Sequence, residues 1–116
     1  MRMQTLINKL KALSDPNRFR IVLMLKIRPL CVCELLEALE IAGGTLSNHL
    51  KILKNSGLIG QKKDGRWIEY HLLNEEAVQF VSMIEKNMKD SSIPDKDRDI
   101  INKTNRSTCT SIVKNG

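Results

Sequence analysis

Aromatic residues and long apolar runs are both scarce in this sequence. Its 116 residues include only Phe19, Trp67, Tyr70 and Phe80 as aromatics, too few for a platform that stacks single-stranded bases. No apolar run approaches the roughly 20 residues of a membrane-spanning helix. The N-terminal segment alternates polar and apolar residues and lacks a signal-peptide core. We therefore expect a cytoplasmic protein with no membrane partner.

Cysteine is also scarce, and the usual catalytic motifs are missing. Cys31, Cys33 and Cys109 form an odd set without a secretion signal, which argues against a disulfide framework. The sequence contains no phosphate-binding loop, no paired acidic motif and no base next to the cysteines. These absences argue against an enzyme. A small metal chaperone would leave the patterns described next unexplained.

Net positive charge is the first positive signal in the sequence. Nineteen Lys and Arg residues against thirteen Asp and Glu give a formal charge of +6 and a pI near 9.4, so a polyanionic partner is expected. Residues 45–72 hold five of these cations, whereas residues 31–44 hold three glutamates and no cation. No helix combines a basic face with a Trp- or Phe-rich apolar face, which favours nucleic acid over a membrane surface.

Residues 41–56 predict a helix that reads DNA. Leu46, Leu50 and Leu53 recur at helical spacing and form one apolar stripe. The opposite side carries short hydrogen-bonding groups and lysine but no carboxylate, which suits base edges and phosphates in a duplex. We expect Gly43-Gly44 to form a tight turn before this helix. An ordinary amphipathic surface helix is the alternative interpretation of this segment alone.

Further helices are predicted from apolar periodicity and capping signals. Ser14-Asp15-Pro16 and Asn74 are helix-start signals, and Gly57 supplies a left-handed stop after the DNA-reading helix. The third predicted helix ends just before that helix begins, so the pair is typical of a helix-turn-helix. The expected ranges are residues 3–13, 17–27, 30–40 and 75–89.

A β-hairpin is predicted directly after the helix-turn-helix. Asp64-Gly65 is a strong turn signal between residues 58–63 and 66–73, which are expected to form the two strands. Lys62, Lys63 and Arg66 lie beside the turn, where we expect them to contact phosphates. A solvated hairpin end, where charges are common, is the alternative interpretation.

The composition changes after residue 90. Residues 91–116 are dominated by Ser, Asp, Lys, Asn and Thr, and they predict a flexible polar C-terminal tail with at most a weak helical turn near Ile100-Ile101. Residues 1–90 are expected to form one domain for DNA binding and dimerisation.

The combination of these segments resembles the ArsR/SmtB family of metal-responsive repressors. The resemblance runs from Leu10 to Leu72 and is carried by LKALSDPNRFRIVLML, LCVCELLEALEI, TLSNHLKILKNSGLI and KKDGRWIEYHL. It implies a winged helix-turn-helix that is mainly α with a two-stranded β-hairpin wing, in the order α-α-α-α-β-β-α. It also implies a homodimer formed through the first and last helices. Such a dimer binds palindromic duplex DNA with half-sites about 34 Å apart, or a multiple of that distance.

Two surfaces follow from the resemblance together with the residue patterns. The DNA-binding candidates lie on the recognition helix and the wing: Thr45, Ser47, Asn48, His49, Lys51, Lys54, Lys62, Lys63 and Arg66. The dimer-interface candidates are apolar residues of the first and last helices: Leu6, Leu10, Leu13, Phe80, Ile84 and Met88.

The resemblance also implies a metalloid-sensing site. The arsenic-responsive branch of the family carries CVC followed by a third cysteine on the same helix. Here Cys31-Val32-Cys33 keeps the pair, while Leu36 occupies the third position. Cys109 is the candidate for the missing thiolate. The ligand set of the zinc branch is absent, because residues 74–90 contain no histidine. His49 and His71 are expected to serve packing or a backbone hydrogen bond instead of a metal.

Two neighbouring thiolates suit soft ions such as As(III), Sb(III), Cd(II) and Cu(I). On an ideal helix Cys31 and Cys33 lie about 200° apart, so they converge on one ion only where Cys31 sits outside the helix and the helix start distorts. We expect a repressor, with no obligatory cofactor, that leaves its operator when As(III) or Sb(III) binds these thiolates. A redox or persulfide sensor of the same fold is one alternative, and simple burial of two small residues is the other.

Overall fold

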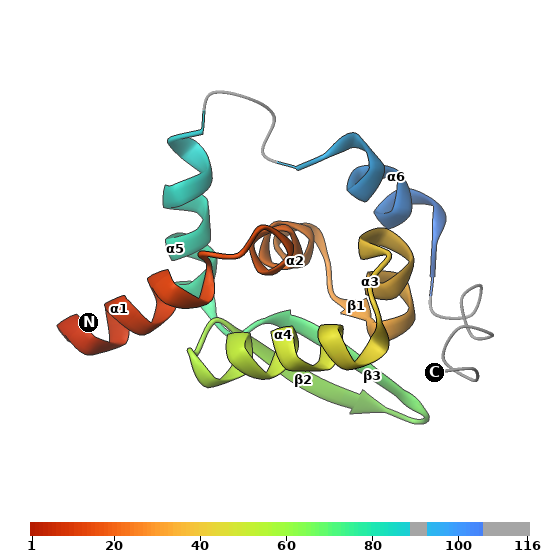
Figure 1. Ribbon diagram of the computed structural model, residues 1–116, viewed down its shortest axis with the longest axis horizontal. Helices are drawn as coiled ribbons and strands as arrows, with labels where there is room; N and C mark the ends of the chain where they lie inside the picture. Colours follow the sequence, from red (N-terminus) through yellow and green to blue (C-terminus); the bar gives the residue numbers. More distant parts are fainter. Residues whose placement is uncertain (89–92, 106–116) are drawn as a thin grey trace.

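The computed structural model describes residues 1–88 and 93–105. In chain order the elements are α1 (Met3–Ala12), α2 (Pro16–Ile27), β1 (Leu30–Cys31), α3 (Val32–Leu39), α4 (Gly43–Asn55), β2 (Ile59–Asp64), β3 (Trp67–Leu72), α5 (Glu75–Lys86) and α6 (Asp95–Lys103). In Figure 1, α2 lies at the centre with α1 and α5 on one side and α3 and α6 on the other, while α4 and the sheet lie below it.

The predicted helix boundaries are confirmed wherever a local capping signal sets them. The Asp15 carboxylate accepts the backbone N–H groups of Asn17 and Arg18, at 2.9 and 3.0 Å, and α2 begins with proline. The Asn74 side chain accepts the backbone N–H of Ala77 at 2.9 Å and starts α5 in the same way. Gly57 follows α4 with φ +84°, the left-handed conformation predicted for a helix stop.

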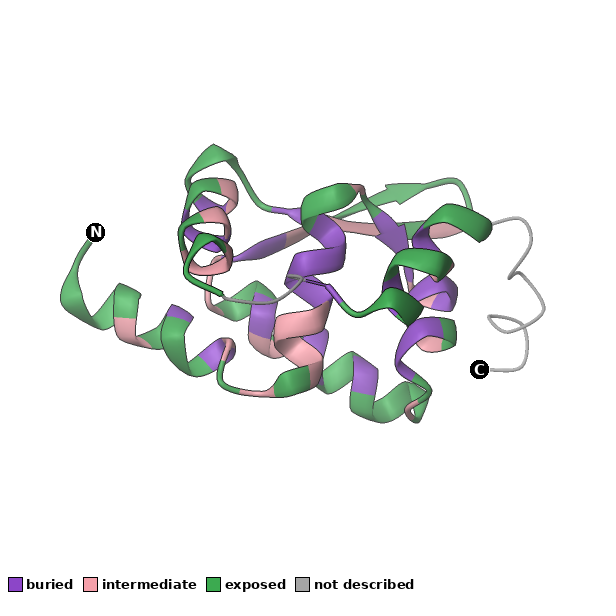
Figure 2. Ribbon diagram, turned by 90° about the horizontal axis from the view of Figure 1, so that it is seen from above, coloured by how far each residue is buried: buried purple, intermediate pink, exposed green. Residues whose placement is uncertain are grey.

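The core forms around α2. Its central residues 21–25 are all buried, and the inward sides of the surrounding helices pack against them (Figure 2). Leu46, Leu50 and Leu53 attach α4 to this core through one face. The opposite face of α4 is left for solvent, as the apolar stripe predicted.

The sheet has three antiparallel strands in the order β1-β3-β2. The wing hairpin was predicted with two strands, and the third strand is the two-residue β1, in which Leu30 pairs with Tyr70 and Cys31 with Glu69. Two residues are too few to display an alternating pattern, so the prediction placed them at the start of a helix instead. The consequence is that Cys31 belongs to the wing sheet and also precedes α3.

The turn between α3 and α4 differs from its prediction. Gly43 and Gly44 are the first residues of α4, and neither has a positive φ. The left-handed residue is Glu40, with φ +54°, at the end of α3. The glycines were wrongly assigned to the turn, because glycine in the exposed first turn of a helix looks the same in the sequence.

Part of the expected polar tail is a helix that packs on the core. Ile93 and Ile101 are buried, and α6 lies against α2 and α3 (Figure 1). Asp97 is fully buried and accepts two hydrogen bonds from Arg20, at 2.6 and 2.9 Å. Arg20 lies 77 positions away, so local composition gave no sign of this pairing. Residues 106–116, including Cys109, lie outside the described part of the chain.

Candidate DNA-binding surface and thiol site

The outer face of α4 is polar and exposed. Thr45, Ser47 and Asn48 form its first half, and Lys51 and Lys54 form its second half. The leucines on the inner face hold the helix against the core, so these side chains project from a fixed support. The arrangement suits contacts with base edges and phosphates of a duplex.

His49 was predicted both as a DNA-binding candidate and as a packing residue, and its position in the structure is that of a packing residue. The residue is 8% exposed and lies on the inner side of α4. Its Nδ1 is 3.3 Å from an Arg18 side-chain nitrogen, and its Nε2 is 3.8 Å from an Asp15 oxygen. The imidazole therefore joins α4 to the start of α2.

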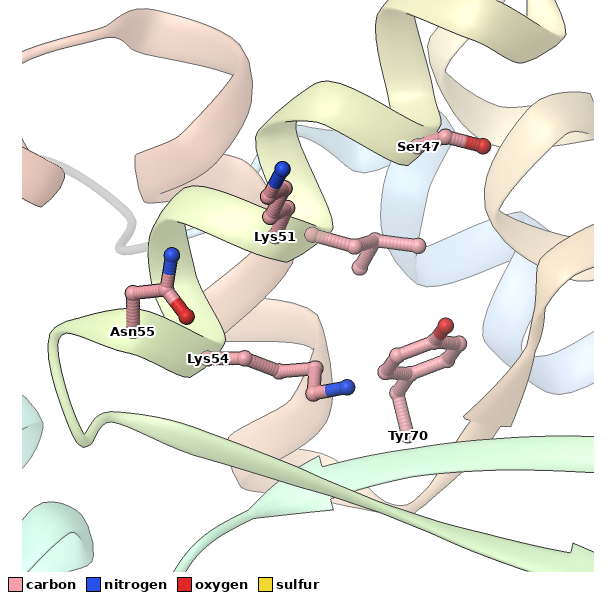
Figure 3. Close-up of a pocket in the computed structure, with 6 residues that line it drawn as sticks. Ser47, Lys51, Lys54, Asn55 and Tyr70 are labelled. Carbon is pink, nitrogen blue, oxygen red and sulfur yellow. The ribbon is translucent and has the colours of Figure 1, made fainter.

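A cavity of about 370 Å³ separates α4 from the wing, with Ser47, Leu50, Lys51, Lys54, Asn55 and Tyr70 along its walls (Figure 3). In Figure 3 the Lys54 side chain extends toward the Tyr70 ring on β3. The Lys54 ammonium donates a hydrogen bond to the Gln61 side chain at 2.8 Å, which ties α4 to β2. Lys54 therefore holds α4 against β2, in addition to the contact with DNA that was predicted for it.

Tyr70 is a residue that sequence reasoning missed. It lies opposite Gln61 in the β2–β3 pairing, so the hairpin register places its ring beside α4. Burial raises the pKa of its phenol above the usual value, which keeps the hydroxyl protonated and able to donate a hydrogen bond. The alternation of residues along the second wing strand is the signal that could have identified Tyr70. Deciding that Tyr70 faces α4, however, required knowing how the two strands of the hairpin pair.

The wing tip carries the predicted cations. Lys62, Lys63 and Arg66 are all exposed, around a turn in which Gly65 has φ +62°. The Arg66 guanidinium lies 4.8 Å from the centre of the Trp67 ring, within the range of a cation–π contact. The wing tip therefore carries a second group of exposed cations beside those of α4.

Cys31 and Cys33 lie together at the start of α3. Both are buried, at 3% and 0% exposure, and they form a small apolar cluster against which Trp67 packs. Cys31 is the N-cap residue with extended backbone angles, whereas Cys33 lies in the first helical turn. Cys31 therefore sits outside the helix, the position that the sequence argument required for two sulfurs to converge.

Glu34 connects this helix start to α6. One of its oxygens accepts the Cys31 backbone N–H at 3.1 Å, completing a capping box. The other oxygen accepts hydrogen bonds from Arg28 at 2.7 Å and from the Thr104 hydroxyl at 3.0 Å. Arg28 also donates to the Ile101 and Thr104 carbonyls, so its charge lies at the C-terminal end of α6. The start of α3 and the end of α6 are thus joined by one ion pair.

The predicted dimer residues differ in exposure. Leu6, Leu10 and Met88 are exposed, at 37%, 49% and 37%, while Leu13 and Ile84 are partly buried. Phe80 is 7% exposed, and the Lys9 ammonium lies 5.8 Å from its ring centre. Phe80 therefore belongs mainly to the core of its own subunit, because its ring already packs there.

Two absences hold within the described residues. No cluster of three or more His, Cys, Asp or Glu side chains has an arrangement that holds a metal ion. No helix in residues 1–88 or 93–105 combines the length and the apolarity that crossing a bilayer requires.

Comparison with known proteins gives a consistent result. Residues 15–60 match the family described as bacterial regulatory protein, arsR family. The chain is 34% identical over 107 residues to the arsenical resistance operon repressor of Staphylococcus xylosus, covering 92% of this chain and 89% of that protein. It is 39% identical over 72 residues to a CadC homologue of Staphylococcus aureus, described as a cadmium resistance transcriptional regulatory protein, covering 61% and 60%.

A solved structure agrees with this result. The transcriptional repressor BigR from Xylella fastidiosa superimposes with a TM-score of 0.67 at 30% identity, covering 78% of this chain and 92% of that one. The predicted winged helix-turn-helix fold is confirmed, with the added strand β1 and helix α6 as the differences from the predicted element order.

Proposed function

The chain belongs to the bacterial ArsR family of regulatory proteins, and from that premise we propose that it is a repressor whose hold on DNA is released when As(III) or Sb(III) binds Cys31 and Cys33. It is a DNA-binding transcriptional regulator and not an enzyme. We propose three further features of this regulator: its inducer, the residues that bind the inducer, and the surface that reads the operator.

The observation that carries the proposal is the double position of Cys31. This residue caps α3, the first helix of the helix-turn-helix, and it also belongs to the sheet that forms the wing. An ion that draws the Cys31 and Cys33 sulfurs together has to change the start of α3. Because that position is part of the wing sheet, and α4 follows α3 in the helix-turn-helix, holding the ion and holding the duplex become mutually unfavourable.

The donor set favours a soft ion. Cys31 and Cys33 belong to one buried cluster, and once Cys33 is reduced its thiolate and that of Cys31 select As(III), Sb(III), Cd(II) and Cu(I) over hard cations. The similarity to a relative named for arsenical resistance over most of both chains supports As(III) or Sb(III) as the inducer. The shorter similarity to a cadmium regulator makes Cd(II) the second candidate.

Cys109 is the third ligand in this proposal. Thr104 is hydrogen-bonded to Glu34, which also binds the backbone of Cys31. Cys109 follows Thr104 by five positions, a length of chain that spans about 17 Å when fully extended. Chain length therefore allows Cys109 to reach the pair in its own subunit, and it replaces the sulfur that Leu36 does not supply.

The DNA surface in this proposal comprises α4 and the wing. Its residues are Thr45, Ser47, Asn48, Lys51, Lys54, Lys62, Lys63 and Arg66, joined by Tyr70 in the cavity between the two elements. A homodimer is formed through the exposed stripes of α1 and α5 and places two such surfaces on a palindrome. Sedimentation equilibrium tests the dimer, since the subunit mass is 13.2 kDa.

The test of the inducer uses a duplex selected from a random pool with the purified protein. In the presence of a phosphine reductant, As(III) or Sb(III) is expected to weaken duplex binding, measured by fluorescence anisotropy. Cys33→Ser is expected to bind the duplex normally and to show no release. Loss of duplex binding by Cys33→Ser would make the thiol structural. Release only after oxidation would favour the redox sensor, and stronger release by Cd(II) would change the inducer.

The test of the third ligand is X-ray absorption of the As(III)-loaded protein. Three sulfur neighbours are expected in the wild type and two in Cys109→Ser. An equal sulfur count in both proteins would exclude Cys109 from the site.

A further inference from the structure

We propose that Trp67 couples the cysteine pair to the wing, so that an ion held by Cys31 and Cys33 displaces the cations of the wing tip as well as α4. This inference rests on the proposed function, because it takes the cysteine pair as the effector site. It makes Trp67 a residue that positions the wing tip. It also gives the bound ion a second way, through the wing, to weaken DNA binding.

The register of the sheet brings Trp67 to the cysteines. Cys31 on β1 lies opposite Glu69 on β3, and Trp67 precedes Glu69 by two positions. Residues two apart on a strand share a face, so Trp67 is the diagonal neighbour of Cys31, at a spacing of about 7–8 Å that an indole spans. The packing of Trp67 against the buried pair of Cys31 and Cys33 agrees with this register.

The same indole contacts the wing tip. The Arg66 guanidinium lies 4.8 Å from the centre of the Trp67 ring, and Arg66 is exposed beside the turn. Trp67 also pairs with Asp64 at the end of the hairpin. One side chain therefore contacts both the cysteine cluster and a cation that the proposed DNA surface uses.

Trp67 is less enclosed than Leu30, the residue that precedes Cys31. Protein interiors are packed without spare volume, so an ion held by two buried sulfurs displaces an adjacent group. Leu30, next to Cys31 in the chain, is fully buried in the main core and is held on all sides. Trp67 is only partly buried and lies on an exposed hairpin. The indole therefore yields, and the Arg66 stacked on it moves with it.

Intrinsic fluorescence tests the contact directly in the wild-type protein. The chain has a single tryptophan, so its emission reports on Trp67 alone. Titration with As(III) under a phosphine reductant is expected to change the emission with the same midpoint as the loss of titratable thiols, and Cys33→Ser is expected to abolish the change. Unchanged emission while the thiols are consumed would overturn this inference and leave the proposed function standing. If As(III) consumes no thiols, both proposals fail.

The coupling itself is tested by substitution. The readout is the ratio of duplex dissociation constants with and without As(III). Trp67→Leu keeps an apolar contact but removes the ring, and it is expected to lower this ratio by about fivefold or more while thiol titration by As(III) stays normal. Trp67→Phe, which keeps a ring for Arg66, is expected to restore most of the ratio. Ile68→Leu, on the opposite face of the same strand, is the control and should match the wild type.

The substitutions can also show that Trp67 does not couple the cysteines to the wing. A folded Trp67→Leu that releases the duplex as completely as the wild type would overturn the inference. If Trp67→Leu does not fold, the wild-type fluorescence titration still decides between the two results.

Discussion

The two helices of the helix-turn-helix differ in what covers them. α3 is contacted by β1 and β3 near its start and by α6 along its side, so its surface is largely occupied by other parts of the same chain. α4 is fastened to the core through its leucines and leaves its polar face open. The helix proposed to read DNA is thus uncovered on its polar face, whereas α3, the helix proposed to respond to the ion, is tied to the sheet and to α6.

The ties on α3 come from charged residues as much as from apolar contacts. Arg20 joins α6 to α2 through Asp97 and also donates to the Ala38 carbonyl of α3, and Lys96 pairs with Glu40 at the end of α3 at 2.6 Å. Glu34 and Arg28 make the corresponding connection at the start of α3. α6 is therefore attached at both ends of α3. On α4, by contrast, Lys51 and Asn48 have no such partner among the hydrogen bonds and ion pairs of the described residues.

The largest predicted effect concerns the covered helix. Asp97→Asn removes the charge of a fully buried carboxylate and leaves the Arg20 guanidinium without its ion-pair partner, so the free energy of unfolding is expected to fall by about 3 kcal/mol. Urea unfolding followed by circular dichroism measures this loss. Asp99→Asn, an exposed position on the same helix, is the control and is expected to change it by less than about 0.5 kcal/mol. Equal losses would mean that α6 does not depend on the ion pair.

The next prediction concerns the open helix. Lys51→Ala is expected to leave stability unchanged, to weaken duplex binding for all sequences alike, and to reduce the slope of log affinity against log salt by about one. Lys103→Ala removes the same charge from an exposed position on α6 and should keep the wild-type slope. Anisotropy titrations at several salt concentrations measure both. A wild-type slope for Lys51→Ala would remove this lysine from the phosphate contacts.

The smallest effect concerns the cap of α2, the helix against which α4 packs. The pKa of Asp15 is lowered, chiefly because its carboxylate accepts the Arg18 backbone N–H. Asp15→Ala is expected to cost about 1 kcal/mol of unfolding free energy at neutral pH. Because the folded-state pKa lies below the unfolded one, this contribution is present above the unfolded pKa and is lost as the pH falls through the folded pKa.

Urea unfolding of the wild type and of Asp15→Ala across acidic pH checks the direction in which the contribution of Asp15 to stability changes with pH. The difference between the two proteins should shrink as the pH falls. Asp15→Asn keeps the cap without the ionisable group and provides the control. A difference that grows toward low pH would contradict the assignment.

The sequence predicted those features whose causes lie close together in the chain. Asp15-Pro16 and Asn74 each set a boundary through contacts within a few residues and were found where they were predicted, while the turn predicted at Asp64-Gly65 lies one residue later, at Gly65 and Arg66. The leucine stripe of α4 likewise indicated which face is buried. The wing and the recognition helix, and with them most of the candidate DNA surface, followed from these local signals.

The features that were missed depend on distant partners. α6 is held by Arg20 and Arg28, more than 70 positions before the groups they bind. His49 is buried because Arg18 lies against it, and the contact of Trp67 with the cysteines requires the pairing of β1 with β3. None of these partners is visible in a local pattern, so only a weak helical turn was predicted where α6 lies, and the Arg18 contact of His49 and the Trp67 contact were not predicted.

The central claim is that the cysteine pair and the duplex compete through the start of α3, and the reciprocal titration tests it most directly. Duplex affinity is measured at increasing As(III), and As(III) affinity is measured with and without saturating duplex. The account predicts that both affinities fall by the same factor, as linkage requires of coupled sites. If As(III) and duplex occupy the protein together, each with the affinity it has alone, the account is contradicted.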